Sequence, residues 1–159
     1  MRLAGAAARP YATGAMADAP VILFDGTCNL CDGVLHFVID RERDGALRFA
    51  ALQSEPGRQR LEAATTPEQA RVLREGTTGD GDPDSVVLIE GGRMYTHSTA
   101  ALRIARYLRW PWRWLRVFVI VPRPIRDAVY RWVARHRYRW FGKTEACRVP
   151  TPELRARFL

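Results

Sequence analysis

The stretch VILFDGTCNLC, residues 21–31, carries an apolar run straight into a pair of cysteines and decides the fold of this chain. The run Val21–Phe24 is apolar at every position and is bounded by Asp25-Gly26, which indicates a short strand buried on both faces. Beyond it, apolar residues recur with the spacing of an amphipathic helix, at Cys31, Val34, Leu35, Val38 and Ile39. The sequence therefore predicts a buried strand that turns through two cysteines into a helix, which Asp44-Gly45 ends.

The segments that follow continue the alternation of strands and helices. Residues 47–51 show the apolar alternation of a second strand, and a helical crossover favours a parallel pair with the first strand. Ser54 and Thr66 are capping residues with a proline in the turn that follows, so each is expected to start a short helix. Residues 76–84 combine turn residues with acidic ones and predict a surface loop.

A hairpin and a closing helix complete this part of the chain. Residues 86–89 and 93–96 are typical of strands and flank Gly91-Gly92, which predicts a tight antiparallel turn. Ser98 caps a helix that reaches about Leu108. A parallel strand–helix–strand unit, an antiparallel hairpin and a final helix are the arrangement of a thioredoxin-like α/β fold. We expect a central mixed sheet of about four strands with flanking helices.

The remaining residues differ sharply in composition. Residues 1–102 hold 10 Lys and Arg against 14 Asp and Glu, whereas residues 103–159 hold 15 against 3. All tryptophans of the chain lie in the second part, at Trp110, Trp112, Trp114, Trp132 and Trp140. A short helix is expected over Trp112–Val121, and Pro124 suits the first turn of a longer one, with an apolar stripe at Ile125, Ala128, Val129, Trp132 and Val133. The fold therefore gains an Arg/Trp-rich helical C-terminal extension.

These patterns divide the chain into three parts. Residues 1–19 are rich in Ala and Arg and lack the apolar core of a secretory signal, so we expect a disordered lead-in or a start codon placed too early, with an organellar transit peptide as the alternative. Residues 20–108 form the thioredoxin-like redox domain, and residues 109–159 form a basic helical extension packed on it. The longest apolar run, residues 117–122, is far shorter than the roughly 20 residues of a membrane span.

The chemistry is expected at the cysteine pair. Cys28 and Cys31 are three positions apart where the first strand meets the first helix, so both sulfurs fall within one helical turn. Backbone N–H groups and the helix dipole stabilise an anion there, which favours the thiolate of Cys28 as nucleophile. Cys31, one turn further on and expected to be less exposed, then resolves the mixed disulfide. The pair is predicted to cycle between dithiol and disulfide.

Two other interpretations of the cysteines stay open. Cys28 and Cys31 could join Cys147 and one histidine in a tetrahedral zinc site, the histidine candidates being His36, His97 and His136. No second Cys-x-x-Cys motif supports this, and we predict no metal and no cofactor. Inert, buried cysteines are the other alternative, and Cys147 alone is either a third redox thiol or a small buried hydrophobe.

Asp25 is the third candidate catalytic residue. It stands three positions before Cys28, where a carboxylate can shuttle the thiol proton, although its charge also opposes thiolate formation. Alternatively, Asp25 accepts hydrogen bonds from backbone N–H groups of the turn. The sequence does not separate the two roles.

The basic tail permits four interpretations. Trp110, Trp112 and Trp114 with the nearby arginines suit contact with an anionic membrane surface. Alternatively the tryptophans pack on the sheet while the arginine stems reach water, which makes the tail part of the fold. A partner protein is a further candidate, and nucleic acid is the least favoured despite the positive charge.

The residues around the cysteines resemble a known family. Asp25-Gly26-Thr27-Cys28-Asn29-Leu30-Cys31 is similar to the Asp-x-x-Cys-x-x-Cys signature of the DCC family, predicted thiol-disulfide oxidoreductases of thioredoxin-like fold. The likeness extends over residues 21–159 and includes 84–88, 95–98, 122–127, 130–131 and 138–152, with Phe141-Gly142-Lys143 and Cys147-Arg148. Thioredoxins place a cis-proline before their third strand, and Pro83 is the nearest candidate here. Asn29-Leu30 replaces their usual Gly-Pro.

The sequence thus predicts a protein-disulfide reductase that works through Cys28 and Cys31. Its partners would be a disulfide-containing protein or small thiol, and an electron donor that the sequence does not identify. A cytoplasmic protein, with peripheral membrane contact as an option, fits a reducing compartment. The alternative is a non-enzymatic binding module, in which the cysteines hold zinc or are inert and the basic aromatic tail recruits a membrane or a protein.

Overall fold

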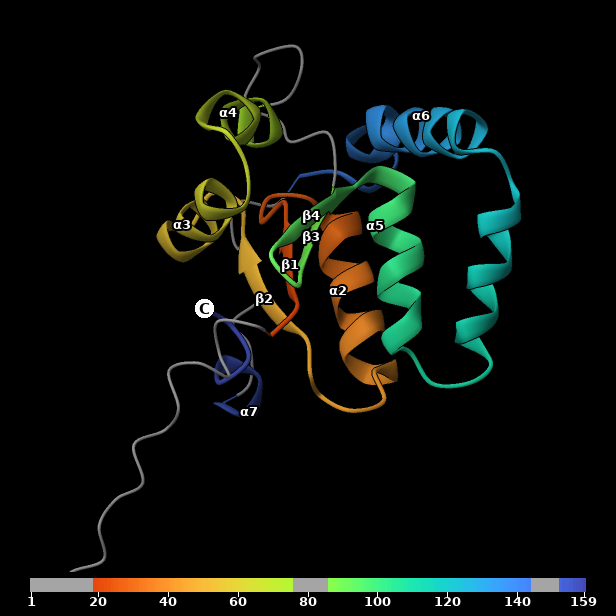
Figure 1. The fold of residues 1–159 in the computed structure, drawn as a ribbon, viewed down its shortest axis with the longest axis horizontal. Helices are drawn as coiled ribbons and strands as arrows, with labels where there is room; N and C mark the ends of the chain where they lie inside the picture. The colour runs from red at the N-terminus through yellow and green to blue at the C-terminus, as the bar shows by residue number, and fades with distance from the viewer. Residues whose placement is uncertain (1–18, 76–85, 144–151) are drawn as a thin grey trace, which may run out of the picture.

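The computed structural model describes residues 19–75, 86–143 and 152–159 (Figure 1). Its elements follow one another as β1 (Val21–Phe24), α2 (Asn29–Arg41), β2 (Arg48–Ala51), α3 (Glu55–Ala64), α4 (Pro67–Glu75), β3 (Val87–Glu90), β4 (Arg93–Thr96), α5 (His97–Ile104), η1 (Ala105–Tyr107), η2 (Trp112–Ile120), α6 (Arg123–Phe141) and α7 (Pro152–Arg155). The two segments labelled η are 3₁₀-helices.

The four strands form one mixed sheet in the order β2-β1-β3-β4. β1 pairs with β2 in parallel, with Val21 opposite Arg48, as expected for a strand–helix–strand crossover. β1 pairs antiparallel with β3, and β3 pairs antiparallel with β4 across the turn at Gly91 and Gly92, both of which have positive φ. The predicted α/β fold, with a mixed four-stranded sheet and flanking helices, is confirmed.

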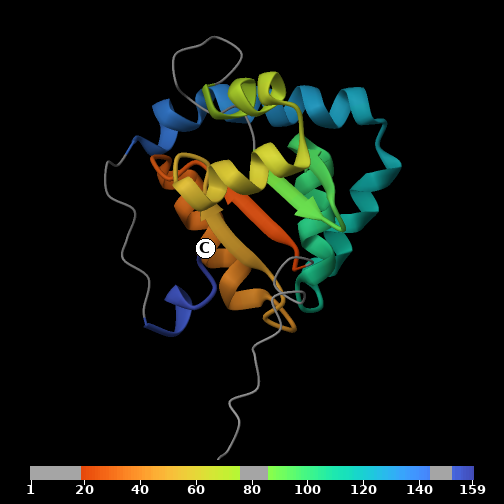
Figure 2. The same cartoon turned by 60° about the vertical axis from the view of Figure 1, so that its left-hand side comes forward.

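Helices cover both faces of the sheet (Figures 1 and 2). Alternate residues of β1 enter two separate cores because successive side chains of a strand point to opposite faces. Ile22 and Phe24 pack in one core with residues of α2 and α5, while Val21 and Leu23 pack in the other with Leu61 of α3 and Ala70 of α4, the helices that lie in front of the sheet in Figure 2. All four residues of β1 are buried, which confirms the prediction of a doubly buried strand.

The end of β2 and the start of α3 approach each other very closely. Ser54 caps α3 by accepting a hydrogen bond from the N–H of Gly57, as its sequence position predicts. A Cβ at Gly57 would lie 2.0 Å from the carbonyl oxygen of Ala51. Only glycine therefore permits this contact between helix and strand.

Two helices differ from the sequence prediction. The prediction that Ser98 caps a helix reaching about Leu108 is wrong in its start: the N-cap residue of α5 is Thr96, Ser98 lies inside the helix, and α5 passes into η1 after Ile104. The helix expected over Trp112–Val121 is the 3₁₀-helix η2. Val117, Val119 and Ile120 are β-branched and crowd an α-helical turn, which lowers their helix propensity.

α6 crosses the end of the molecule where β1 stops and α2 begins (Figure 1). It contacts α5 and α2, and hydrogen bonds to other elements hold it in place. The N–H of Val86 donates to the hydroxyl of Tyr130 at 3.1 Å, and the hydroxyl of Ser98 donates to Asp127. Residues of α6 are thereby held beside the cysteine pair, although they lie far from the cysteines in the sequence.

The C-terminal residues close the open edge of the sheet at β2. Phe49 donates its N–H to the carbonyl of Arg157 at 3.0 Å and accepts the N–H of Leu159 at 2.9 Å. The ring of Phe158 packs against those of Phe24 and Phe49, with centroids 6.2 and 5.7 Å apart. This pairing, which the helical interpretation of the extension did not predict, covers an edge that would otherwise expose unpaired backbone groups.

Candidate active site

The cysteine pair lies where the sequence predicts it, at the start of α2. Cys28 is the N-cap residue and Cys31 is in the first turn. The N–H of Cys31 points at the sulfur of Cys28, with 3.4 Å between nitrogen and Sγ. The unpaired N–H groups of a helix start favour an anion at this position. The geometry therefore suits a thiolate at Cys28.

The relative exposure of the two cysteines is the reverse of the expectation. Cys28 is 2% exposed, whereas Cys31 is partly exposed. The residues at and just after the end of α6 lie against this turn: the backbone of Cys28 pairs with that of Lys143, and the side-chain amide of the adjacent Asn29 donates to the carbonyl of Phe141 at 2.8 Å. A sequence argument from the first helix alone could not include these contacts, because they come from more than 100 residues away.

The two thiols differ strongly in acidity. A hydrogen bond from the Cys31 side chain, against the opposing effect of burial, lowers the pKa of Cys28 from 9.0 to about 6, and the Cys31 N–H and the positive charge of Arg137 add to this. The same hydrogen bond, burial and the neighbouring thiolate raise the pKa of Cys31 well above its ordinary range. At neutral pH the pair therefore holds one thiolate, on Cys28, and one thiol, on Cys31.

Asp25 sits at the centre of a buried hydrogen-bond cluster. Its Oδ1 accepts from the N–H and hydroxyl of Thr27 at 2.9 and 2.8 Å and from the side-chain amide of Gln53 at 3.0 Å. Its Oδ2 accepts from the hydroxyl of Tyr138 and from Nη2 of Arg137 at 3.2 Å. Burial opposes ionisation, but the hydrogen bonds from Tyr138, Thr27 and Gln53 prevail and lower the pKa of Asp25.

Three members of this cluster were not singled out by sequence reasoning. Gln53 comes shortly after β2, and Asp25 comes directly after β1. Because the carboxyl ends of adjacent parallel strands meet at one edge of the sheet, the position of Gln53 near Asp25 could have been predicted. Tyr138 is the first residue of the segment 138–152, which resembles the C-terminal part of the DCC family sequences. Arg137 carried no comparable signal, because it stands among many arginines of α6 and differs from them only in being buried.

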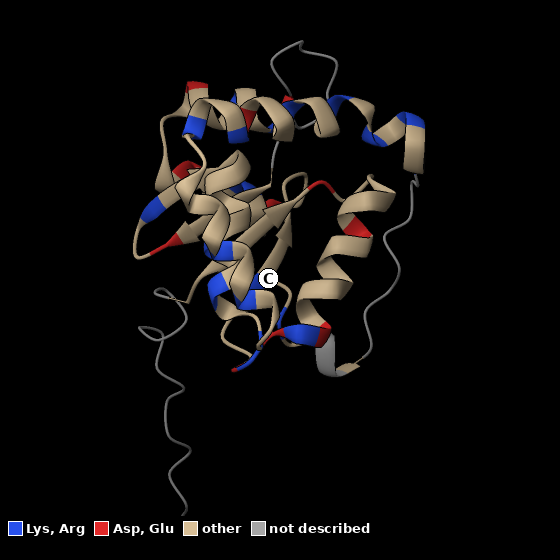
Figure 3. Ribbon diagram, turned by 90° about the vertical axis from the view of Figure 1, so that its right-hand side faces the viewer, with Lys and Arg blue, Asp and Glu red and all other residues tan. Residues whose placement is uncertain are grey.

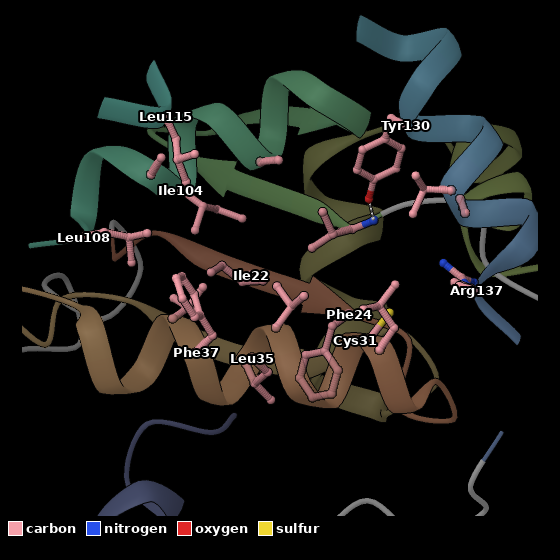
Figure 4. A pocket seen from close by; sticks show the side chains of 18 residues that line it. Ile22, Phe24, Cys31, Leu35, Phe37, Ile104, Leu108, Leu115, Tyr130 and Arg137 are labelled. Carbon is pink, nitrogen blue, oxygen red and sulfur yellow. Dashed lines mark hydrogen bonds between the residues drawn. The ribbon is translucent and has the colours of Figure 1, made fainter. Parts of the chain in front are cut away.

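An apolar cavity of about 420 Å³ adjoins the cysteine pair (Figure 4). It is bounded by β1, α2, α5, η2 and α6. Cys31, Tyr130 and Arg137 lie at one end, and Ile104, Leu108 and Leu115 lie at the other (Figure 4). Cys31 lines this cavity and Cys28 does not. Volume and lining are typical of a site for a small apolar group beside a few polar ones.

The histidines considered for zinc each have other neighbours. His36 lies 3.6 Å from Asp32, and His97 lies 3.0 Å from the hydroxyl of Thr96. His136 stacks with Trp140 and contacts the carbonyl of Trp132. Within residues 19–75, 86–143 and 152–159, no three His, Cys, Asp or Glu side chains gather as a metal site. Cys147 and Pro83 lie outside the described residues.

A family model and the name of one relative agree on one family. The family model of DCC1-like thiol-disulfide oxidoreductase matches residues 22–143. The chain is 45% identical over 139 residues to the uncharacterized protein YuxK of Bacillus subtilis (strain 168), covering 87% of this chain and 93% of that protein. It is 41% identical over 131 residues to the Arabidopsis thaliana protein named "DCC family protein At1g52590, chloroplastic", covering 82% of this chain and 69% of that protein. No solved structure is significantly similar. The chain belongs to the DCC1-like thiol-disulfide oxidoreductase family.

Proposed function

We propose that this protein is a disulfide reductase in which Cys28 and Cys31 exchange two electrons with a substrate disulfide. The observation that carries the proposal is the N-terminal position of Cys28 on α2, with the N–H of Cys31 at 3.4 Å from its sulfur. The hydrogen bond from the Cys31 side chain, with this N–H and the charge of Arg137 adding to it against the effect of burial, lowers the pKa of Cys28 to about 6, which makes Cys28 the nucleophile at neutral pH.

The proposed reaction is a pair of thiol–disulfide exchanges. The Cys28 thiolate attacks one sulfur of the substrate disulfide, the substrate S–S bond breaks, and one substrate thiolate leaves and is protonated by solvent. Cys31 then loses its proton to solvent and attacks the sulfur of Cys28. The mixed disulfide breaks, the second substrate thiolate leaves and is protonated, and a Cys28–Cys31 disulfide forms. A thiol reductant returns the protein to the dithiol state by the same exchanges.

Asp25 and Arg137 are assigned positioning roles in this proposal. Every contact of the Asp25 carboxylate named above is to a donor, and its pKa is lowered, so the group stays ionised and is a poor acceptor for the proton of Cys31. It fixes the turn before Cys28 through the N–H of Thr27, the second of the two roles considered for it. Arg137 supplies the positive charge beside the cysteines.

The cavity indicates how a substrate reaches the pair. Cys28 lies beneath the residues that end α6, whereas Cys31 borders the cavity. We infer that an apolar group attached to the disulfide occupies the space between α2, α5 and α6 that Cys31 borders. Substrates with an apolar group next to the disulfide should therefore react faster than fully polar ones.

A redox titration of the purified full chain in glutathione buffers tests the proposal. Alkylation of free thiols followed by peptide mass mapping should show one reversible two-electron step confined to Cys28 and Cys31. The Cys147→Ser variant is the matched control and should titrate in the same way. Failure of the pair to form a disulfide, or full reductase activity in a Cys28→Ser variant, contradicts the proposal and favours the non-enzymatic binding module.

A further inference from the structure

One large surface of the molecule takes no part in the proposed thiol chemistry. It is an exposed apolar surface on η2 that continues onto α6. Among the described residues, every exposed large hydrophobic side chain except Val34 lies between Trp110 and Phe141. Residues 109–120 are exposed without exception. Soluble monomers rarely leave apolar patches of more than a few hundred Å² uncovered, and larger ones mark a binding surface.

The 3₁₀ geometry of η2 sorts its side chains into columns. With three residues per turn, side chains at i and i+3 lie above one another. One column contacts the protein at two positions: Trp112 packs edge-on against Phe37 of α2 at 4.8 Å, and Leu115 lines the cavity, whereas Phe118 in the same column is 57% exposed. A second column, Trp114, Val117 and Ile120, is 65%, 52% and 83% exposed. We call this second column the outer column.

A third column places positive charge directly beside the outer column. Arg113 and Arg116 are exposed and lie one residue before Trp114 and Val117. Residues 109–143 contain ten Lys and Arg and one Asp, a net charge of +9. Figure 3 looks onto this side of the molecule and shows blue bands along α6 at the top. The surface thus combines exposed apolar side chains with a strong positive field.

The surface continues beyond η2 at both ends. Trp110, 75% exposed, precedes it, and Ile125 and Val129, 56% and 58% exposed, follow on α6. The stripe predicted for α6 therefore faces solvent at Ile125, Val129 and Trp132, while Val133 lines the cavity. Apolar groups, tryptophans and flanking arginines are the composition of segments that lie in the headgroup region of a bilayer.

Charge decides between a bilayer and other occupants. A second copy of this chain docked on the same face would bring two strongly positive surfaces together, and like charges facing each other across an interface are unfavourable. Nucleic acid would neutralise the arginines and could stack a base on Trp114, but it would offer Val117 and Ile120 no apolar partner. An anionic bilayer suits both the arginines and the apolar side chains, because its headgroups pair with arginine and the acyl boundary accepts the apolar side chains.

We propose that the outer column of η2, with Trp110 and the adjacent arginines, docks the protein on the surface of a bilayer rich in anionic lipid. No helix in the described ranges is long and apolar enough to cross a membrane. The docked chain lies on the headgroups, with Trp110 and Trp114 at their level. The inference rests on exposure and charge alone and does not depend on the activity of the cysteine pair.

Tryptophan fluorescence with vesicles tests the proposal directly, because all five tryptophans fall between residues 110 and 140. The full chain is mixed with vesicles of phosphatidylcholine and phosphatidylglycerol in equal parts, or of phosphatidylcholine alone. We expect a blue shift of emission and co-sedimentation with the anionic vesicles, both weakened by added salt, and little of either with the neutral ones.

Paired variants separate specific docking from general attraction. Val117→Ser with Ile120→Ser should weaken vesicle binding at least about tenfold, since apolar area is removed from an exposed site without disturbing the core. Arg113→Gln with Arg116→Gln should weaken it by about fivefold per arginine. Arg58→Gln with Arg71→Gln removes the same charge from exposed positions on α3 and α4, across the sheet from η2, and should bind nearly as the unchanged chain does.

Three outcomes would overturn the proposal. The first is that anionic vesicles leave the emission and the sedimentation of the protein unchanged. The second is that the control pair of arginine variants loses as much binding as the pair on η2, which would show attraction without a docking face. The third is that light scattering finds a dimer that Val117→Ser with Ile120→Ser dissociates, which would assign the surface to a second copy of the chain.

Discussion

The carboxylate of Asp25 lies 3.2 Å from Nη2 of Arg137, and the two side chains are only 1% and 5% exposed. The residues are 112 positions apart, one at the end of β1 and the other on α6. Each buried charge is balanced by the other and by further hydrogen bonds, including those with Tyr138. The pair joins α6 to the sheet at the point where the cysteines lie.

The effects of removing Asp25 and Arg137 on the free energy of unfolding should not be additive. Asp25→Asn and Arg137→Gln each leave an uncompensated buried charge, and we expect each to lower the free energy of unfolding by about 3–5 kcal/mol. The double variant should lose clearly less than the sum. Urea denaturation of the four proteins measures the coupling energy.

The control for this cycle is the exposed pair of Glu68 and Arg71 on α4. These side chains are 2.9 Å apart and more than half exposed, so their coupling energy should stay below about 1 kcal/mol. Additive losses at Asp25 and Arg137 would contradict the assignment of a buried, mutually dependent pair.

Arg137 should also contribute to the acidity of the nucleophile, beside the hydrogen bond from Cys31. Its positive charge favours the Cys28 thiolate, so Arg137→Gln is expected to raise the pKa of Cys28 above about 6. The rate of alkylation by iodoacetamide, followed from pH 5 to 9, reports this pKa as its midpoint. Arg135→Gln, an exposed position of the same helix, serves as the matched control and should leave the midpoint in place. An unchanged midpoint in Arg137→Gln would argue against a charge effect.

The reduced protein should become more stable as the pH rises from about 6 to about 9. Cys28 has a pKa of about 6 in the folded chain against 9.0 ordinarily, so in this window the unfolded chain binds a proton that the folded chain has released. Stability then increases with pH by up to about 1.4 kcal/mol per unit, and the gain is lost as the pH falls through 6. Urea denaturation at a series of pH values under reducing conditions measures the slope.

The Cys28→Ser variant isolates this contribution. Without the thiol the slope between pH 6 and 9 should flatten, whereas Cys31, whose pKa is raised, affects stability only above that window. An identical slope in the variant and the unchanged chain would assign the pH dependence to other groups.

Filling the cavity should change substrate preference. Ala134 lines the cavity, so Ala134→Phe is expected to lower kcat/KM for a disulfide with apolar substituents by about tenfold or more, because the space for those groups is occupied. Reduction of oxidised glutathione should change much less. Ala128→Phe, at an exposed position of the same helix, is the control. Equal losses for both substrates would show a general disturbance of the site.

The local sequence determined much of this architecture. The run Val21–Phe24, the capping residue Ser54 and the Gly91-Gly92 turn each specify their element through neighbours in the chain, and the structure contains all three as predicted. The position of Cys28 and Cys31 at a helix start follows from the same local logic, since a continuously apolar strand precedes them and an amphipathic helix follows. Local periodicity and capping need no knowledge of distant residues.

Tertiary structure alone decided the environment of that pair. Three contacts join segments about 110 residues apart: the backbone pairing of Cys28 with Lys143, the ion pair of Asp25 with Arg137, and the pairing of the C-terminal residues with β2. Helical periodicity does not say which face of α6 meets the core, and here the apolar stripe predicted for it is largely on the solvent side. Contacts of this kind depend on how α6 packs against α2 and α5, because packing, rather than propensity, determines which charged side chain is buried and which apolar ones stay exposed.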